Sequence, residues 1–331
     1  MGSDPGDGIA NGVYMLFVTF HGGKPEQHAL LNNVHAYDKD GKKLTGTVLD
    51  DAAGVVLNEL RGVCLRGNLL YVVNANKDQN SILCYEGGGT KFHFVSTFAS
   101  GASCPGILHP FDLTFDDAGF CYLSSQDTNL VTRLKVSKDG RTGTPAMIAA
   151  GLAGHGEFPS GTFVGSSVGN LAGGRATAVA APAGLGYSVT GEKKHSVRGV
   201  LWANNALYVA DQPEGRVKVY DKDGRFLGQS NVVDSPIHLT LHEGHLYVSG
   251  GNEILTAKLK RPGGDFALDV VPGLRIKNGS GMVFTEEGRL YLASRTENVI
   301  HKFGADLAPL KFECRLPDNP EFLLHVSQES V

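Results

Sequence analysis

The sequence lacks the features that would place the protein on nucleic acid or within a membrane. Its 30 Lys and Arg residues form no basic tract and the formal net charge is −4, so we expect no nucleic-acid partner. No apolar run approaches the ~18 residues that a membrane helix needs. The first 12 residues are acidic and contain no basic segment followed by an apolar stretch, so no signal peptide is predicted. These absences predict a cytoplasmic protein.

Several catalytic motifs are also missing. There is no phosphate-binding GxxxxGK loop, no GxGxxG and no HExxH, so nucleotide-dependent chemistry has no support. The five cysteines are odd in number and form no CxxC pair. Those at 64, 84 and 121 lie in strand-like runs, where a reduced cysteine serves as a small buried hydrophobe.

One pattern recurs along the chain instead: a short apolar strand, a Gly or Asn turn, and an apolar-Tyr strand. It reads RGVCLRGNLLYVVN at 61–74, PFDLTFDDAGFCYLSS at 110–125, RGVLWANNALYVAD at 198–211, PIHLTLHEGHLYVSG at 236–250 and SGMVFTEEGRLYLAS at 280–294. Most intervals between the repeated tyrosines match one propeller blade of roughly 40–50 residues. The longer interval from Tyr122 to Tyr208 is one blade plus an insertion.

A third strand follows each repeat, and Asp-Gly turns such as VYDKDGRFLG predict a hairpin to a fourth. Residues 13–20 and 35–48 supply strands two to four of another blade, and NPEFLLHV at 319–326 supplies its missing inner strand. We therefore predict an all-β, six-bladed β-propeller with four antiparallel strands per blade. The ring is closed by pairing the C-terminal strand with the N-terminal blade. An open β-sandwich or two smaller β domains is the alternative.

The predicted domain organisation is a flexible segment at 1–12 followed by a single propeller over 13–331. Residues 151–195 interrupt the repeat with a Gly-, Ala- and Ser-rich insertion. Long loops in ordered domains usually have a function, so a lid or pocket wall is one interpretation. A flexible excursion on the rim, or an extra hairpin, is the other.

Segment 207–228, LYVADQPEGRVKVYDKDGRFLG, resembles an NHL repeat and is also similar to the blades of SMP-30/gluconolactonase-like proteins. The resemblance covers most of the chain at the level of the blade. It implies the fold, but the same architecture carries unrelated activities, so function must be argued from the site.

Inner strands start, and second strands end, on one face of a propeller near its axis; we call this face the mouth. Loop-rich mouths favour ligand sites. Five inner strands begin with a charged or titratable residue, and we predict that these converge as catalytic groups: Arg61, Asp112, Arg198, His238 and Glu321. His238 would be a general base or a ligand, with Asp112 or Glu321 as its carboxylate partner, and both arginines would stabilise developing negative charge.

Aligned positions at the strand ends supply further predicted ligand-binding residues: His21, Asn74, His109, Asp211 and Ser280. For the predicted catalytic residues and for the predicted ligand-binding residues, the alternative is a purely structural role. Asp112 could cap its own turn, and the two arginines could pair with Asp211 or Glu321 as braces.

A divalent metal ion is an open alternative. The resemblance to SMP-30-like lactonases implies a cation held by carboxylate and amide oxygens at the mouth, and Asp211 matches the position of a metal-binding Asp in that family. Glu321, Asn74 and Asp112 could complete this set, but the PNG segment that supplies an Asn ligand is missing. A second set, His109 and His238 with His21, resembles the histidine metal sites of propeller lyases. The metal candidates are therefore His109, His238 and Asp211.

Together these observations predict a small-molecule enzyme of hydrolase, lyase or cyclase type that acts at the mouth. The alternative is an NHL-like module that binds a ligand or a protein partner without catalysis. A propeller whose repeats have lost any site is the third possibility.

Overall fold

The computed structural model describes residues 14–22, 31–104, 106–146, 186–188, 197–259, 263–312 and 314–327. The predictions for residues 1–12, and for 151–195 apart from the backbone of 186–188, lie outside these ranges. In the described part of the chain, no helix has the length and apolar character needed to cross a membrane.

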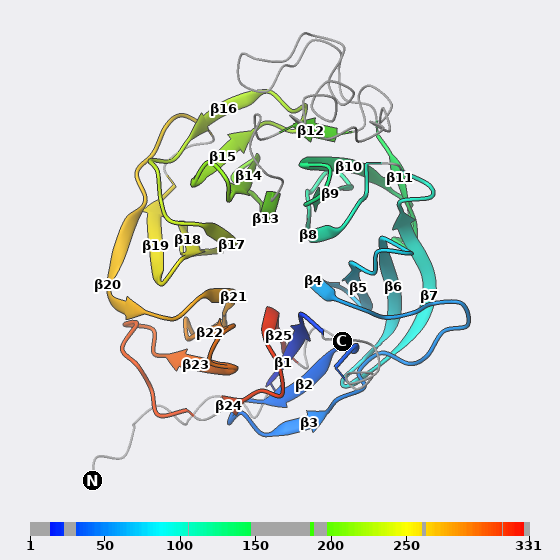
Figure 1. Cartoon of the computed structure of the whole chain (residues 1–331), viewed down its shortest axis with the longest axis horizontal. Coiled ribbons are helices and arrows are strands. Elements are labelled where there is room, and N and C mark those ends of the chain that lie inside the picture. Colours follow the sequence, from blue (N-terminus) through cyan, green and yellow to red (C-terminus); the bar gives the residue numbers. More distant parts are fainter. Residues whose placement is uncertain are drawn as a thin grey trace.

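Six β-sheets stand around a common axis, each with its innermost strand facing the centre of the ring (Figure 1). Strands are given from the inner one outward. Blade 1 contains β25 Pro320–Ser327, β1 Tyr14–Phe20, β2 His35–Asp38 and β3 Lys43–Thr45; blade 2 contains β4 Leu60–Arg66, β5 Leu69–Asn74, β6 Ser81–Gly88 and β7 Lys91–Ser100. Blade 3 contains β8 Pro110–Phe115, β9 Phe120–Ser125, β10 Leu130–Val136 and β11 Gly143–Pro145.

Blades 4 to 6 follow the same order. Blade 4 contains β13 Val197–Ala203, β14 Ala206–Asp211, β15 Arg216–Tyr220 and β16 Phe226–Gln229, and blade 5 contains β17 Pro236–His242, β18 His245–Gly250, β19 Glu253–Lys258 and β20 Asp269–Arg275. Blade 6 contains β21 Gly279–Phe284, β22 Leu290–Ser294, β23 Val299–Phe303 and β24 Cys314–Arg315. A further short strand, β12 Gly186–Ser188, pairs with β10.

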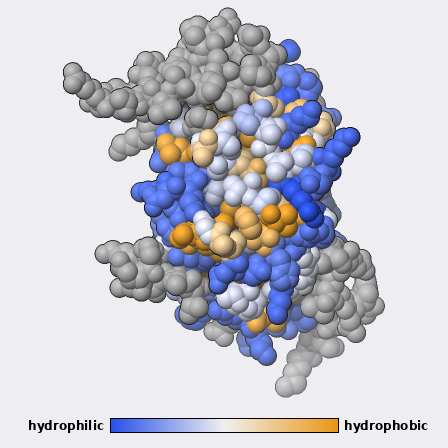
Figure 2. All heavy atoms as spheres, turned by 90° about the vertical axis from the view of Figure 1, so that its right-hand side faces the viewer, coloured by the Kyte–Doolittle hydropathy of each residue, from blue (hydrophilic) through white to orange (hydrophobic). Residues whose placement is uncertain are grey.

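The predicted fold class and closure are confirmed. Strand β25 pairs antiparallel with β1 along its length, so residues from the two ends of the chain build blade 1. The repeated tyrosines occupy equivalent places in the second strands, and those at 71, 122, 208 and 291 are buried between neighbouring blades. All five cysteines are free, as expected for small apolar residues of such interfaces. Apolar side chains on the rim near β7 and β11 are interrupted by hydrophilic ones (Figure 2).

Every inner strand carries one extra residue near its start, opposite the end of its neighbouring second strand. Such a β-bulge bends the strand and redirects its side chains. The six bulged segments are Arg61-Gly62, Phe111-Asp112, Arg198-Gly199, Ile237-His238, Ser280-Gly281 and Glu321-Phe322. Five of these segments contain the predicted catalytic residues and the sixth contains Ser280, so the bulge explains why these positions differ from an ordinary alternating strand.

The second residue of these segments alternates around the ring. It is glycine in blades 2, 4 and 6, where a Cβ would approach the backbone of the next blade; at Gly281 it would lie 2.6 Å from the Leu323 nitrogen. In blades 1, 3 and 5 it carries a side chain, and a hydroxyl of the second strand accepts its N–H. The three pairs are Phe322 with Thr19, Asp112 with Ser124 and His238 with Ser249, at 3.1–3.2 Å. The hydroxyls thus satisfy amides that the bulges remove from the ladder.

Candidate functional site

The mouth is organised around the buried carboxylate of Glu321. One of its oxygens, Oε1, lies 2.6 Å from Arg61 Nη1, 2.7 Å from Arg295 Nη2 and 3.1 Å from His21 Nδ1. Burial alone raises the pKa of Glu321, but the charges of Arg61 and Arg295 outweigh it and lower that pKa to about 2. Glu321 is therefore an ionised anchor that holds two guanidiniums in place.

Arg198 occupies a different environment. Its Nε donates to Gln212 Oε1 at 2.7 Å, its Nη1 donates to Gln126 Oε1, and its guanidinium lies over the ring of Phe111, 5.0 Å from the centroid. It makes no ion pair with any carboxylate of the described residues. Burial lowers the pKa of Arg198 to about 10, so the group remains a cation at neutral pH. The charge of Glu321 still acts on it, which places Arg198 in the same electrostatic field.

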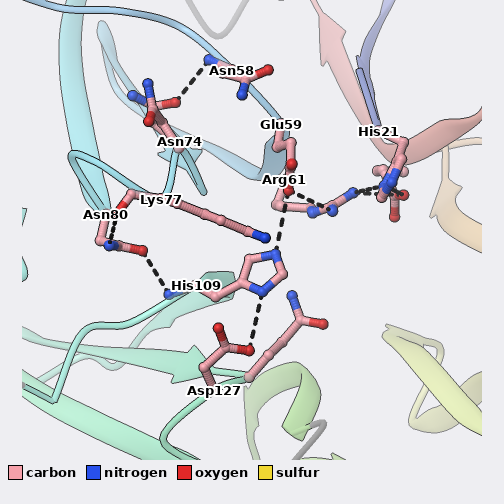
Figure 3. A network of polar contacts seen from close by, with 12 residues as sticks. His21, Asn58, Glu59, Arg61, Asn74, Lys77, Asn80, His109 and Asp127 are labelled. Carbon is pink, nitrogen blue, oxygen red and sulfur yellow. Dashed lines mark hydrogen bonds and ion pairs between the residues drawn. The ribbon is translucent and has the colours of Figure 1, made fainter. Parts of the chain in front are cut away.

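A chain of charged side chains continues from Arg61 into blade 3 (Figure 3). Arg61 Nη2 lies 3.5 Å from Glu59 Oε2, which lies 3.4 Å from His109 Nε2; His109 Nδ1 lies 3.2 Å from Asp127 Oδ1. The hydrogen bonds to Asp127 and Glu59 raise the pKa of His109, although burial opposes them. The amino group of Lys77 extends towards His109 in the same view.

The backbone of this chain is strained. Glu59 and His109, each directly before an inner strand, have positive φ angles of 52° and 50°, a region that side chains other than those of Gly, Asn and Asp rarely adopt. The amide of His109 donates to Asn80 Oδ1 at 2.7 Å, which helps to hold this conformation. Positive φ angles also directly precede two other inner strands, at Ser235 (46°) and Asn278 (45°), so this conformation belongs to the blade pattern, and here Glu59 and His109 lie in contact.

Four predicted residues brace the fold. Both Asp112 oxygens accept backbone N–H groups, from Leu113 at 2.8 Å and Val200 at 3.0 Å, and burial raises the pKa of this carboxyl to about 7. The structure thus supports the capping alternative for Asp112. The others bind backbone or a neighbouring charge: Asn74 holds Val56 and Asn58, Asp211 pairs with Lys218 at 2.9 Å, and Ser280 donates to the carbonyl of Pro320.

His238 lies on the bulge of inner strand β17 and is buried. Its ring packs edge-on against Phe322, with centroids 5.2 Å apart, and Phe322 makes the same contact with Phe111 across the channel. Burial lowers the pKa of His238 to about 4, and its Nδ1 has no hydrogen-bond partner among the described residues. The predicted partnership with Asp112 or Glu321 is therefore absent: Asp112 is committed to backbone amides and Glu321 to Arg61 and Arg295.

The metal candidates do not form a common site. No three His, Cys, Asp or Glu side chains among the residues placed by the structure are grouped so that they could hold an ion. Asp211 already pairs with Lys218, His109 contacts two carboxylates, and His238 packs against the ring of Phe322. The donor set does not fit a divalent cation, and we derive no step through one.

Several mouth residues were missed by reasoning from sequence. Gln126, Gln212 and Arg295 each come one residue after the strand end that the repeat alignment selected, at the position that His21 occupies in blade 1. Successive side chains of a strand point in opposite directions, so the last strand residue turns into the blade and the following residue turns to the mouth. The repeat alignment therefore pointed to the position directly before each of these residues.

Comparisons with known proteins support the architecture. No known protein family matches the sequence, and no curated protein is significantly similar to it. Among solved structures, a Bacteroides fragilis protein assigned provisionally as a 6-phosphogluconolactonase is similar over 98% of this chain and 100% of its own, with 15% identity and a TM-score of 0.57.

A chain of the nidogen/laminin complex is similar over 96% of this chain and 99% of its own, with 12% identity and a TM-score of 0.56. A Bacteroides caccae protein of unknown function covers 95% and 99%, with 10% identity and a TM-score of 0.59. These likenesses establish the fold alone.

Proposed function

We propose that the mouth binds a small anionic molecule and that the protein is an enzyme of hydrolase, lyase or cyclase type acting on it. The observation that carries the proposal is Arg198, a half-buried cation held by two neutral amide oxygens and an aromatic face. Withdrawing a charge from water without a counter-ion is costly, and no carboxylate of the described residues pairs with Arg198, so an anionic ligand would supply that partner. Arginine is well suited to this role because its planar fork binds carboxylate and phosphate oxygens in pairs.

The charge balance supports the same conclusion. Among the described residues around the mouth, four cationic side chains lie near three carboxylates: Arg61, Arg198, Arg295 and Lys77 near Glu59, Asp127 and Glu321. The hydrogen bonds to Asp127 and Glu59 raise the pKa of His109, which favours its charged form. Fixed cations stabilise negative charge that develops on oxygen during ester or lactone hydrolysis, elimination or ring closure.

The first test is calorimetric titration with inorganic phosphate. Arg198→Gln should weaken binding about tenfold to a hundredfold, because hydrogen bonds to a charged group contribute roughly 1.5–3 kcal/mol. Arg133→Gln is the matched control: Arg133 also stacks on a phenylalanine, Phe120, but it is paired with Asp223. Equal loss in both variants, or no binding by the wild type, would refute the anion site.

The second test is turnover. The provisional assignment of one structural neighbour makes 6-phosphogluconolactone a reasonable first substrate, because its phosphate suits the arginines. Proton release in a pH-stat, followed for this lactone and for a panel of carboxylated esters and lactones, measures hydrolysis directly. Phosphate binding without turnover of any member would favour the binding-module alternative.

A further inference from the structure

His21 directly follows β1 and its side chain is 43% exposed, whereas the Arg61 and Glu321 side chains that it contacts are 3% and 1% exposed. Its Nδ1 faces both of them, at 2.7 Å from Arg61 Nη1 and 3.1 Å from Glu321 Oε1. The imidazole is thus fixed at one nitrogen by buried groups, and Nε2 is the nitrogen left for other partners.

The contact with Arg61 determines the tautomer. A guanidinium is always protonated and can only donate, and its Nη1 carries two hydrogens that diverge in the plane of the group. One of them is directed to His21 Nδ1 at 2.7 Å, while Glu321 Oε1 forms an ion pair with the same nitrogen at 2.6 Å. Nδ1 must then accept, and the neutral ring carries its proton on Nε2.

The opposite tautomer would place a hydrogen on Nδ1 that points to Glu321 across the longer distance of 3.1 Å. That hydrogen would face the donor Nη1 of Arg61, so two donors would oppose each other at 2.7 Å. Glu321 does not need this extra donor, because Arg61 and Arg295 already bind the same oxygen. The charged groups around the ring are these two arginines, Glu321 and Glu59.

We infer that His21 is a ligand-contacting residue of the mouth and donates a hydrogen bond from Nε2–H to an oxygen of the bound anion. The inference rests on the proposed anion site and names one more group of it. An imidazole fixed in this way binds a phosphate or carboxylate oxygen, or the oxyanion that develops on a carbonyl, without giving up its proton. Arg61 acts through His21 as a positioning residue, since its N–H selects the tautomer.

The tautomer can be measured without a substrate. Long-range ¹H–¹⁵N spectra of the full-length protein with labelled histidine distinguish Nδ1–H from Nε2–H, and His21→Gln assigns the signals. His93 is an internal control, because its Nδ1 lies 2.6 Å from Asp50 and must donate. We expect His93 as the Nδ1–H form, His21 as the Nε2–H form, and a shift of the His21 Nε2 signal when inorganic phosphate is added. An Nδ1–H form at His21, or no response of its Nε2 to bound phosphate, overturns the inference.

A pair of substitutions tests the same point by affinity. The amide nitrogen of Gln can take the place of Nε2, whereas Asn reaches only the position of Nδ1. His21→Gln should therefore keep phosphate affinity within about threefold, and His21→Asn should lose about tenfold. Equal affinities in the two variants overturn the inference but leave the anion site intact if Arg198→Gln still weakens binding by the expected factor. Absence of phosphate binding in the wild type overturns the proposed function instead, and the spectra still report the tautomer.

Discussion

Replacement of the carboxylate that anchors the mouth gives a quantitative test of the electrostatics. The pKa of Glu321 falls from 4.5 to about 2 on folding, and each tenfold change in an equilibrium corresponds to about 1.4 kcal/mol, so its ionised form contributes about 3 kcal/mol of stability. Because the folded pKa is depressed, this contribution is present above about pH 4.5 and is lost as the pH falls towards about 2. About 2 kcal/mol should disappear between pH 7 and pH 3.

Glu321→Gln should remove that part of the pH dependence. At pH 7 the variant should also be about 3–5 kcal/mol less stable, because Arg61 and Arg295 lose their buried partner. Glu253→Gln is the control, since Glu253 lies 3.8 Å from an exposed arginine and its loss should cost at most about 0.5 kcal/mol.

Urea unfolding at pH 7, 5, 4 and 3 provides the measurement. The single tryptophan, Trp202, stacks on Tyr122 with centroids 5.3 Å apart, so its fluorescence reports loss of the interface between blades 3 and 4. The reasoning is refuted if the wild type and Glu321→Gln lose the same free energy of unfolding between pH 7 and pH 3.

Three further predictions concern the groups around the channel, and all are measured by urea unfolding. Burial raises the pKa of Asp112 from 3.8 to about 7, so the contribution of this carboxyl to the stability of the wild type should fall as the pH rises from about 4 to about 8. Asp112→Asn should remove this part of the pH dependence of the free energy of unfolding. A pH dependence that does not change in the variant would contradict the raised pKa of Asp112. Gly281→Ala should lower the free energy of unfolding by about 1–3 kcal/mol, because the new Cβ meets backbone atoms of blade 1. Gly67 lies in open space at φ 59°, so Gly67→Ala should cost only about 1 kcal/mol for its backbone conformation. Equal losses in the two variants would argue against close packing of blades 6 and 1 at Gly281. Lys218→Met should cost about 3–5 kcal/mol by leaving the carboxylate of Asp211 without its cation, while Lys222→Met at an exposed pair should change stability by less than about 1 kcal/mol.

The sequence indicated where several mouth residues lie, but it did not indicate which side chains contact each other. The repeat alignment identified Arg61, Arg198 and Glu321 as mouth residues because the blade pattern is local and repeats with the strands. It did not identify Arg295, since that residue lies one position beyond the strand end used for the alignment. It also assigned His238 a partner that it does not have, because nothing in the sequence indicates that Phe322 packs against that ring from a different blade.

The sequence by itself determined the blades, their order and the closure of the ring. These depend on alternating apolar residues, turn residues and spacing, which are properties of neighbouring residues in the chain. Only the tertiary structure decided which side chains meet in the mouth. His21 and Glu321 are 300 positions apart, and a one-residue bulge in each inner strand sets the direction of the side chains that face them. Contacts of this kind follow from packing between blades, so they appear only when the ring is assembled.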